Sequence, residues 1–167
     1  MQIALDQVKA LRQLTGAGVM DCKKALEEAG GDISKAELIL KAKGAASVAR
    51  KAGSVTREGV IDSYIHSGSR IGAMVELNCE TDFVARTSEF RELAHQLSLQ
   101  VAAMNPLYID RSDMPSEDAR DPEEVCLLQQ PYIKDPTKVV QELITELAAR
   151  VGENVRVRRF ERFALGE

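Results

Sequence analysis

The sequence predicts an α+β fold, in which a small helical domain precedes a core of helices packed on a small antiparallel β-sheet. Three observations support this class. Residues 5–40 carry apolar side chains at helical spacing between glycines. Residues 59–66 and 70–78 are two β-rich runs around a short glycine turn. Residues 88–104 and 135–151 return to helical periodicity before a last predicted strand.

The first predicted domain, residues 1–43, contains three short helices, with Asp32 as the N-cap of the third. Apolar residues follow one face of each helix: Leu5, Val8, Leu11, Leu14, then Val19, Leu26, then Ile33, Ala36, Leu38, Ile39 and Leu40. Such stripes are more often core than docking surface, so we interpret them as core and keep docking as the alternative. The bundle resembles a ubiquitin-associated domain, which would expose an apolar patch at its first turn and third helix.

Residues 44–57 are basic and rich in small side chains, and we interpret them as a solvated helix end followed by a linker. The alternative is a docking site for an anionic partner on Lys43, Arg50 and Lys51. The second predicted domain is residues 58–167. It begins with the hairpin, whose two strands are joined by Ser67-Gly68-Ser69.

Two helices and a last strand complete the predicted core. Ser88 is expected to cap the first helix, which ends before Asn105-Pro106. Asp135-Pro136 predicts the start of the second helix and Gly152 predicts its end. The strand at 154–160 alternates until Arg159-Phe160, where its parity breaks as it does at a β-bulge.

Composition excludes several classes of protein. Lys and Arg number 22 against 26 Asp and Glu, and a net charge of -4 argues against a general binder of phosphate backbones. An RNA-binding surface is a minority interpretation of Arg156, Arg158, Arg159 and Arg162, because no aromatic residues alternate with them; we expect them on the solvent face. We therefore expect no direct nucleic-acid partner.

Location and redox state follow from what the chain lacks. It has no leader and no apolar run that could span a bilayer, so we expect a cytoplasmic protein without a membrane partner. The cysteines, Cys22, Cys79 and Cys126, are odd in number and lack a CxxC pair. They indicate neither a disulfide framework nor a zinc site.

Enzymatic chemistry finds little support in the sequence. His66 and His95 are the only histidines, and no nucleophile motif or phosphate-binding glycine loop accompanies them. Glu80 and Asp82 stand two apart and could share a metal, but no third ligand lies near them. We expect no catalytic residue, no metal and no cofactor.

The most informative segment is residues 76–86. A strand-like alternation stops at Thr81-Asp82, and Phe83 follows at the start of a connection. A large apolar side chain beside a carboxylate at the end of an element is typical of a recognition tip. We call residues 81–84 the tip.

Residues 76–86 and 11–26 resemble the two signature regions of the elongation factor Ts family, whose members exchange guanine nucleotide on elongation factor Tu. The similarity continues at 104–107, 124–128 and 158–167. The resemblance implies that Thr81, Asp82, Phe83 and Val84 insert near the magnesium site of elongation factor Tu and promote GDP release. It further implies that the N-terminal domain contacts this partner through Leu11, Arg12, Thr15, Gly16, Val19 and Met20, although Leu11 and Val19 could belong to the core instead.

The chain is short for this family, whose full-length members carry a duplicated core subdomain. Residues 115–122 lead almost directly to Glu124, and we find one core unit. A two-fold pairing of two such cores would mimic the duplication, so we expect a homodimer. The rival interpretation is an adaptor that binds a ubiquitin-like or helical ligand through the N-terminal domain, which leaves the tip unexplained.

Overall fold

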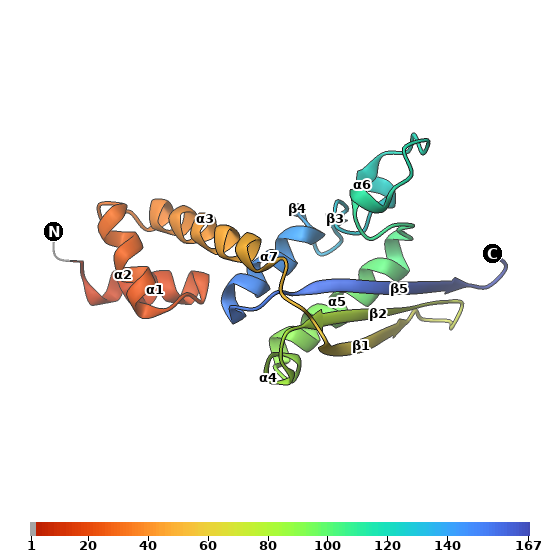
Figure 1. Cartoon of the computed structure of the whole chain (residues 1–167), viewed down its shortest axis with the longest axis horizontal. Coiled ribbons are helices and arrows are strands. Elements are labelled where there is room, and N and C mark those ends of the chain that lie inside the picture. Colours follow the sequence, from red (N-terminus) through yellow and green to blue (C-terminus); the bar gives the residue numbers. More distant parts are fainter. Residues whose placement is uncertain (1–2) are drawn as a thin grey trace.

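The computed structural model describes residues 3–167 and confirms the α+β class. Figure 1 shows an elongated molecule with its helical N-terminal domain at one end and its C-terminus at the other. Among residues 3–167, no helix has the length and apolar character needed to cross a membrane. The main elements are α1 (Leu5–Thr15), α2 (Val19–Glu28), α3 (Ile33–Lys51), β1 (Glu58–Ile65), β2 (Ile71–Cys79), α5 (Ser88–Met104), α7 (Val140–Val151) and β5 (Arg156–Ala164). The shorter ones are α4 (Asp82–Ala85), η1 (Arg111–Asp113), α6 (Pro122–Val125), β3 (Pro131–Tyr132) and β4 (Asp135–Val139).

The N-terminal domain is the predicted three-helix bundle, and its buried core is Val8, Leu11, Cys22, Ala25, Leu26 and Ala36. Asp32 caps α3 as predicted, since its carboxylate accepts a hydrogen bond of 3.0 Å from the Lys35 amide. The resemblance to a ubiquitin-associated domain stays a prediction.

The core interpretation was wrong for four apolar residues of these helices. Leu5, Leu14 and Leu38 are each 66% exposed and Val19 is 45% exposed. At 3.6 residues per turn, a spacing of three rotates the side chain by about 60° per step, so a run from Leu5 to Leu14 turns through about half a circle. Only the middle of that run, Val8 and Leu11, can face a small core.

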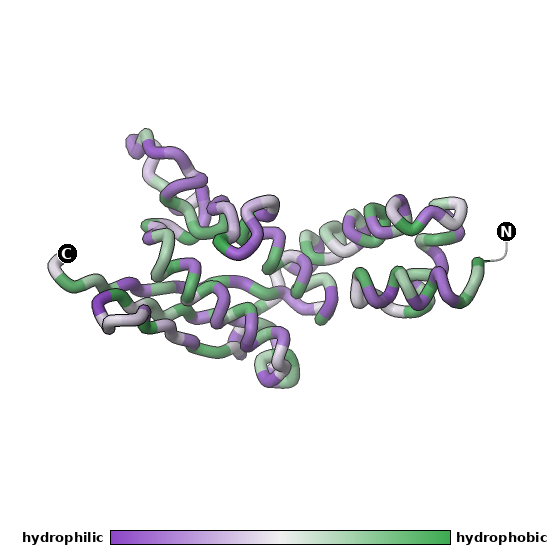
Figure 2. Tube along the Cα trace, turned by 180° about the vertical axis from the view of Figure 1, so that it is seen from behind, coloured by the Kyte–Doolittle hydropathy of each residue, from purple (hydrophilic) through white to green (hydrophobic). Residues whose placement is uncertain are grey.

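The core domain is built on an antiparallel sheet in the order β1-β2-β5. Helix α5 packs across one face, where Phe90 and Leu97 meet Val75 and Leu77 in the main hydrophobic cluster. Hydrophobic and hydrophilic residues interleave along these elements, as structures with one buried face require (Figure 2). The register shifts between Glu76 and Leu77, opposite Arg158, so the predicted bulge exists one residue earlier than expected.

The start of the second core helix was predicted too early. Residues 135–139 form β4, which pairs with β3, and α7 begins at Val140. The Asp135 carboxylate accepts hydrogen bonds from both the amide (3.2 Å) and the hydroxyl (2.6 Å) of Thr137, which makes a local turn rather than a helix cap. Helix α5 also differs slightly, because its N-cap is Thr87 rather than Ser88.

The segment predicted as a solvated helix end followed by a linker, residues 44–57, is helical as far as Lys51. Its small side chains allow α3 to lie close against α7: a Cβ added to Gly44 would be 3.0 Å from the Cβ of Ala149. Lys41 of α3 also pairs with Glu146 of α7 at 3.8 Å. The composition that suggested flexibility therefore permits close packing between the two domains.

This packing predicts the effect of filling Gly44. Gly44→Val should lower the free energy of unfolding by about 1–3 kcal/mol, because a branched side chain overpacks the contact with α7. Ala46→Val, at an exposed position of the same helix, is the matched control and should change stability much less. Urea unfolding of the two variants measures the difference, and equal stability of both would contradict the close contact.

Candidate functional site

The tip is a strand end that continues into a single helical turn. β2 ends at Cys79, and the Thr81 hydroxyl accepts a hydrogen bond of 3.5 Å from the Val84 amide as the N-cap of α4. Threonine suits an N-cap, and the negative charge of Asp82 in the first turn is favourable near a helix N-terminus. The sequence therefore dictates a defined turn at this position.

Phe83 points away from the core, whereas the two residues that follow it point into the core. Phe83 is 79% exposed, whereas Val84 is 9% and Ala85 is 5% exposed. The interpretation of Phe83 as a core residue is thus excluded. An isolated ring exposed to this extent, on a turn that is anchored beside it, has the geometry of an interaction site.

The base of the tip is fixed by Glu153, which lies beyond the end of α7. One carboxylate oxygen, Oε2, accepts hydrogen bonds from the amides of Glu80 (3.1 Å) and Thr81 (3.0 Å). The other, Oε1, accepts from the Thr81 hydroxyl at 2.6 Å. Sequence reasoning missed this residue, since 72 positions separate Glu153 from Thr81.

The carboxylates of Glu80 and Asp82 bind different groups of the chain. A Glu80 oxygen accepts a hydrogen bond of 2.6 Å from the Asn154 amide. Asp82 pairs with Arg86 at 2.9 Å, and both side chains are well exposed, so the pair contributes little to stability. Within residues 3–167 no group of three or more His, Cys, Asp or Glu side chains is placed to hold a metal ion.

Cys79 belongs to the same network. Its buried thiol donates a hydrogen bond of 3.1 Å to the Thr81 carbonyl. Burial, together with the nearby Glu153 carboxylate, raises the pKa of the Cys79 thiol to about 11. The thiol is therefore protonated at neutral pH and can act as a donor.

The N-terminal candidates divide into surface and core. Arg12, Gly16, Val19 and Met20 are exposed, while Thr15 is half-buried and uses its hydroxyl to bond the Leu11 carbonyl at 2.8 Å. Leu11 itself is fully buried. Leu11 therefore cannot contact a partner in this structure, because its side chain fills the centre of the three-helix bundle. We call the exposed set Arg12, Leu14, Gly16, Val19 and Met20 the N-terminal patch.

Arg150 connects the N-terminal patch with the core. Its side chain lies against Gly16, so that a Cβ there would be 3.1 Å from the guanidinium Nε. The same guanidinium bonds Glu89, close after the tip, at 3.3 Å. Figure 1 shows α4 at the end of the sheet nearer to the N-terminal helices. The tip and the N-terminal patch therefore lie toward the same part of the molecule.

The basic and arginine-rich segments are largely engaged within the chain. Lys43 pairs with Glu28 at 2.7 Å, and Lys51 donates to the Gly152 carbonyl. Arg162, expected on the solvent face, is mostly buried and donates to the Ala102 carbonyl at 3.0 Å. Its guanidinium satisfies a carbonyl in the last turn of α5, which explains why it turns inward.

One cluster has the residue types of a hydrolase triad without the necessary geometry. The Asp62 carboxylate contacts His95 Nδ1 at 2.9 Å and accepts a hydrogen bond of 3.2 Å from the Ser98 hydroxyl. Nucleophilic activation needs serine to donate to histidine, but here the fully buried Ser98 donates to the carboxylate and to a backbone carbonyl. The cluster ties α5 to β1.

Comparisons with known proteins agree on one family. A family model described as Elongation factor TS matches residues 23–121. Elongation factor Ts of Thermotoga petrophila is 50% identical over 100% of this chain and 98% of its own. Those of Thermotoga maritima (49% identical; 100% and 98%) and Carboxydothermus hydrogenoformans (46%; 99% and 90%) are similar. The chain thus spans nearly the whole length of these relatives.

The buried Cys79 predicts a dependence of stability on alkaline pH. The folded pKa of about 11 exceeds the ordinary value of 9.0, so the unfolded thiol ionises first as pH rises. The contribution of Cys79 should be complete below pH 9 and should disappear as pH approaches 11. Melting temperatures of the wild type and Cys79→Ser, measured across this range, should converge or cross toward high pH; a constant difference would contradict the burial of a protonated thiol.

Proposed function

Because the chain belongs to the elongation factor Ts family, we propose that it is a guanine-nucleotide exchange factor for elongation factor Tu and that its tip promotes GDP release. Family membership makes it a translation elongation factor rather than an enzyme. The observation that carries the mechanism is the 79% exposure of Phe83 on a turn whose next residues are buried. The proposal puts its action in the cytoplasm, without nucleic acid or membrane as a direct partner.

The tip acts by displacement. The Phe83 ring enters the nucleotide domain of the partner near its magnesium site, shifts the side chains there, and weakens the hold on magnesium and the phosphates of GDP. Asp82 can join this contact at small cost, because its exposed pair with Arg86 is weak. Val84 and Thr81 contribute by fixing the turn, since Val84 is buried and Thr81 is the N-cap.

The magnitude of the effect requires contacts beyond the tip. Burial of one phenylalanine supplies about 1.5–3 kcal/mol. A thousandfold acceleration of GDP release requires the barrier to fall by about 4 kcal/mol. The remaining energy comes from the N-terminal patch, where Val19 and Met20 (45% and 60% exposed) offer apolar surface and Arg12 offers a charge.

Exchange also requires that the factor leave the partner. By linkage, a factor that weakens the binding of nucleotide and magnesium must itself be weakened when they bind. Incoming GTP therefore releases the tip, and the chain acts in repeated cycles rather than as an inhibitor.

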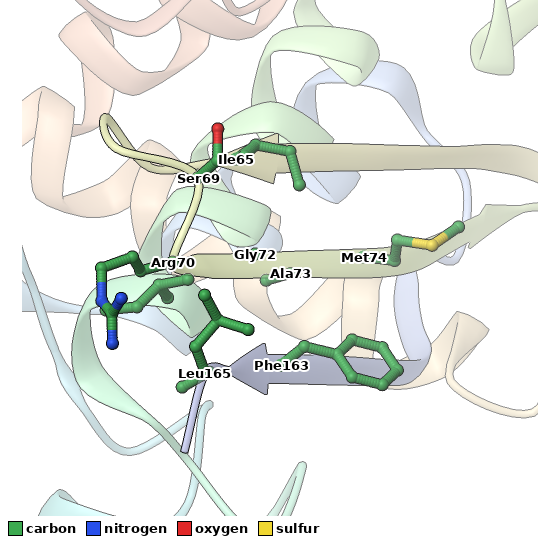
Figure 3. A pocket seen from close by; sticks show the side chains of 10 residues that line it. Ile65, Ser69, Arg70, Gly72, Ala73, Met74, Phe163 and Leu165 are labelled. Carbon is green, nitrogen blue, oxygen red and sulfur yellow. The ribbon is translucent and has the colours of Figure 1, made fainter. Parts of the chain in front are cut away.

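The homodimer is part of this proposal, and the outer face of the sheet is its surface. Figure 3 shows Ile65, Met74, Phe163 and Leu165 around a shallow hollow on that face. These side chains are 50–72% exposed, and Ile61 on β1 is 61% exposed. Ile65 and Phe163 both lie opposite Gly72 in the register, and the missing side chain at Gly72 makes room for the Ile65 methyl. An apolar face of this kind is usually covered.

A second copy suits this face better than an unrelated partner. The core is single, and a two-fold axis would bring the same apolar patch of two chains together. Glu76, paired with Arg159 at 2.7 Å and with Arg158 at 3.7 Å, forms a polar border beside it. The adaptor alternative, in which the N-terminal domain binds a ubiquitin-like or helical ligand, accounts for the N-terminal patch but for neither the tip nor this face.

The tip predicts a separation of folding from exchange. Phe83→Ala should leave the melting temperature near that of the wild type, since the ring has little packing to lose, and should slow stimulated GDP release by about 10- to 100-fold. Asp82→Ala should have a milder effect. Val139→Ala is the control: this exposed apolar residue precedes α7, at the end of that helix opposite Glu153, and the variant should retain full exchange. If the double variant with Asp82→Ala and Phe83→Ala folds and still stimulates GDP release fully, the proposed mechanism is wrong.

The proposed dimer predicts that a charge placed on the outer face of the sheet lowers the mass measured in solution. Sedimentation equilibrium at micromolar concentration should give twice the monomer mass of 18.3 kDa. Phe163→Glu should return the monomer, because a charge would be buried without a partner. Val55→Glu adds the same charge at another exposed apolar site and should remain a dimer. A wild-type chain that sediments only as the monomer, alone and with its partner, would remove the dimer from the proposal.

A further inference from the structure

The turn Gly152–Asn154, between α7 and β5, forms hydrogen bonds with two distant parts of the chain. On one side it contacts the base of the tip, at Glu80 and Thr81. On the other it contacts the end of α3 and the residues that follow it, Lys51 to Ser54. Figure 1 shows the chain that leaves α3 passing beside the start of β5.

The hydrogen bonds between this turn and the base of the tip are stronger than those between the turn and the end of α3. The single carboxylate of Glu153 accepts three hydrogen bonds, of 3.1, 3.0 and 2.6 Å, from two amides and one hydroxyl of residues 80 and 81. A return bond of 2.6 Å runs from the Asn154 amide to Glu80. Hydrogen bonds to an ionised acceptor are about twice as strong as neutral ones. The strand end that carries Phe83 is thereby held in both directions.

The other side of the turn holds the exit from α3. The Asn154 side chain is 6% exposed and donates to the carbonyls of Ala52 (3.2 Å) and Ser54 (2.9 Å). The ammonium group of Lys51 donates to the Gly152 carbonyl. The two Asn154 contacts are half-buried, so breaking them leaves polar groups unsatisfied, whereas the Lys51 contact is exposed.

We propose that Glu153 and Asn154 are positioning residues for exchange: Glu153 sets the tip, and Asn154 sets the N-terminal domain relative to it. The inference rests on the proposed exchange function. Adjacent residues of one turn hold the two partner-binding regions, so their separation is fixed before the partner binds. Binding energy is then available to distort the partner and is not consumed in ordering the factor.

The test compares Glu153→Ala, Asn154→Ala and Glu124→Gln in the full chain, with two measurements. The first is hydrogen exchange at the amides of Glu80 and Thr81 in the free protein. The second is the rate of GDP release from elongation factor Tu as a function of factor concentration. Glu124 is exposed, and among residues 3–167 no hydrogen bond involves its carboxylate, so its variant is the control.

Glu153→Ala should accelerate exchange of both amides by about tenfold or more and should lower the maximal rate of GDP release by a similar factor. Asn154→Ala should leave the two amides protected and the maximal rate near that of the wild type. It should raise the concentration for half-maximal release by about tenfold, because the N-terminal domain is no longer held in place. The control should match the wild type in every measurement.

Unchanged amide exchange in Glu153→Ala, or lost protection with a normal maximal rate, would overturn the role of Glu153. A normal half-maximal concentration in Asn154→Ala would overturn that of Asn154. Where an alanine variant does not fold, Glu153→Gln replaces Glu153→Ala and Lys51→Met replaces Asn154→Ala. Each replacement removes the charge of one contact of the turn. Glu153→Gln should change amide exchange and the maximal rate less than Glu153→Ala, and Lys51→Met should raise the half-maximal concentration less than Asn154→Ala. A wild type that does not stimulate GDP release refutes the exchange function instead, while hydrogen exchange still decides whether Glu153 holds the tip.

Discussion

The exposed ring of Phe83 gains little from packing within its own chain, so its position depends on the residues on either side of it. Val84 and Ala85 anchor the turn from the side of the core. Glu153 anchors the strand end with hydrogen bonds to Glu80 and Thr81. A rigid apolar group can perturb a partner, whereas a mobile one would first have to be ordered at the expense of binding energy.

The same constraint accounts for the arrangement of the two domains. Helix α3 is long and is packed on α7 through Gly44, so the N-terminal domain is a fixed extension of the core and not a tethered module. Arg150 supports this arrangement from the other side, between Gly16 and Glu89. The N-terminal patch and the tip can therefore contact one partner together. The proposed mechanism requires both contacts, because the burial of Phe83 alone supplies too little free energy.

Local patterns in the sequence predicted most of the fold. The hairpin, the cap at Asp32, the helix at 88–104 and the exposure of Phe83 all follow from short-range rules of spacing and capping. Long-range contacts could not be predicted this way. Nothing near Glu153 indicates that it bonds residues 80 and 81, and the small residues around Gly44 have the same composition in a linker as in a close helix contact. The helix start predicted at Asp135 was wrong for a related reason, because aspartate side chains both cap helices and form hydrogen bonds within turns.

The most direct test of the central claim is the release of labelled GDP from elongation factor Tu, with and without this chain and its Phe83→Ala variant. The account predicts rapid release with the wild type and release slowed by about 10- to 100-fold with a variant that melts at the same temperature. Equal release rates with the folded variant and the wild type, or no stimulation by the wild type, would contradict it.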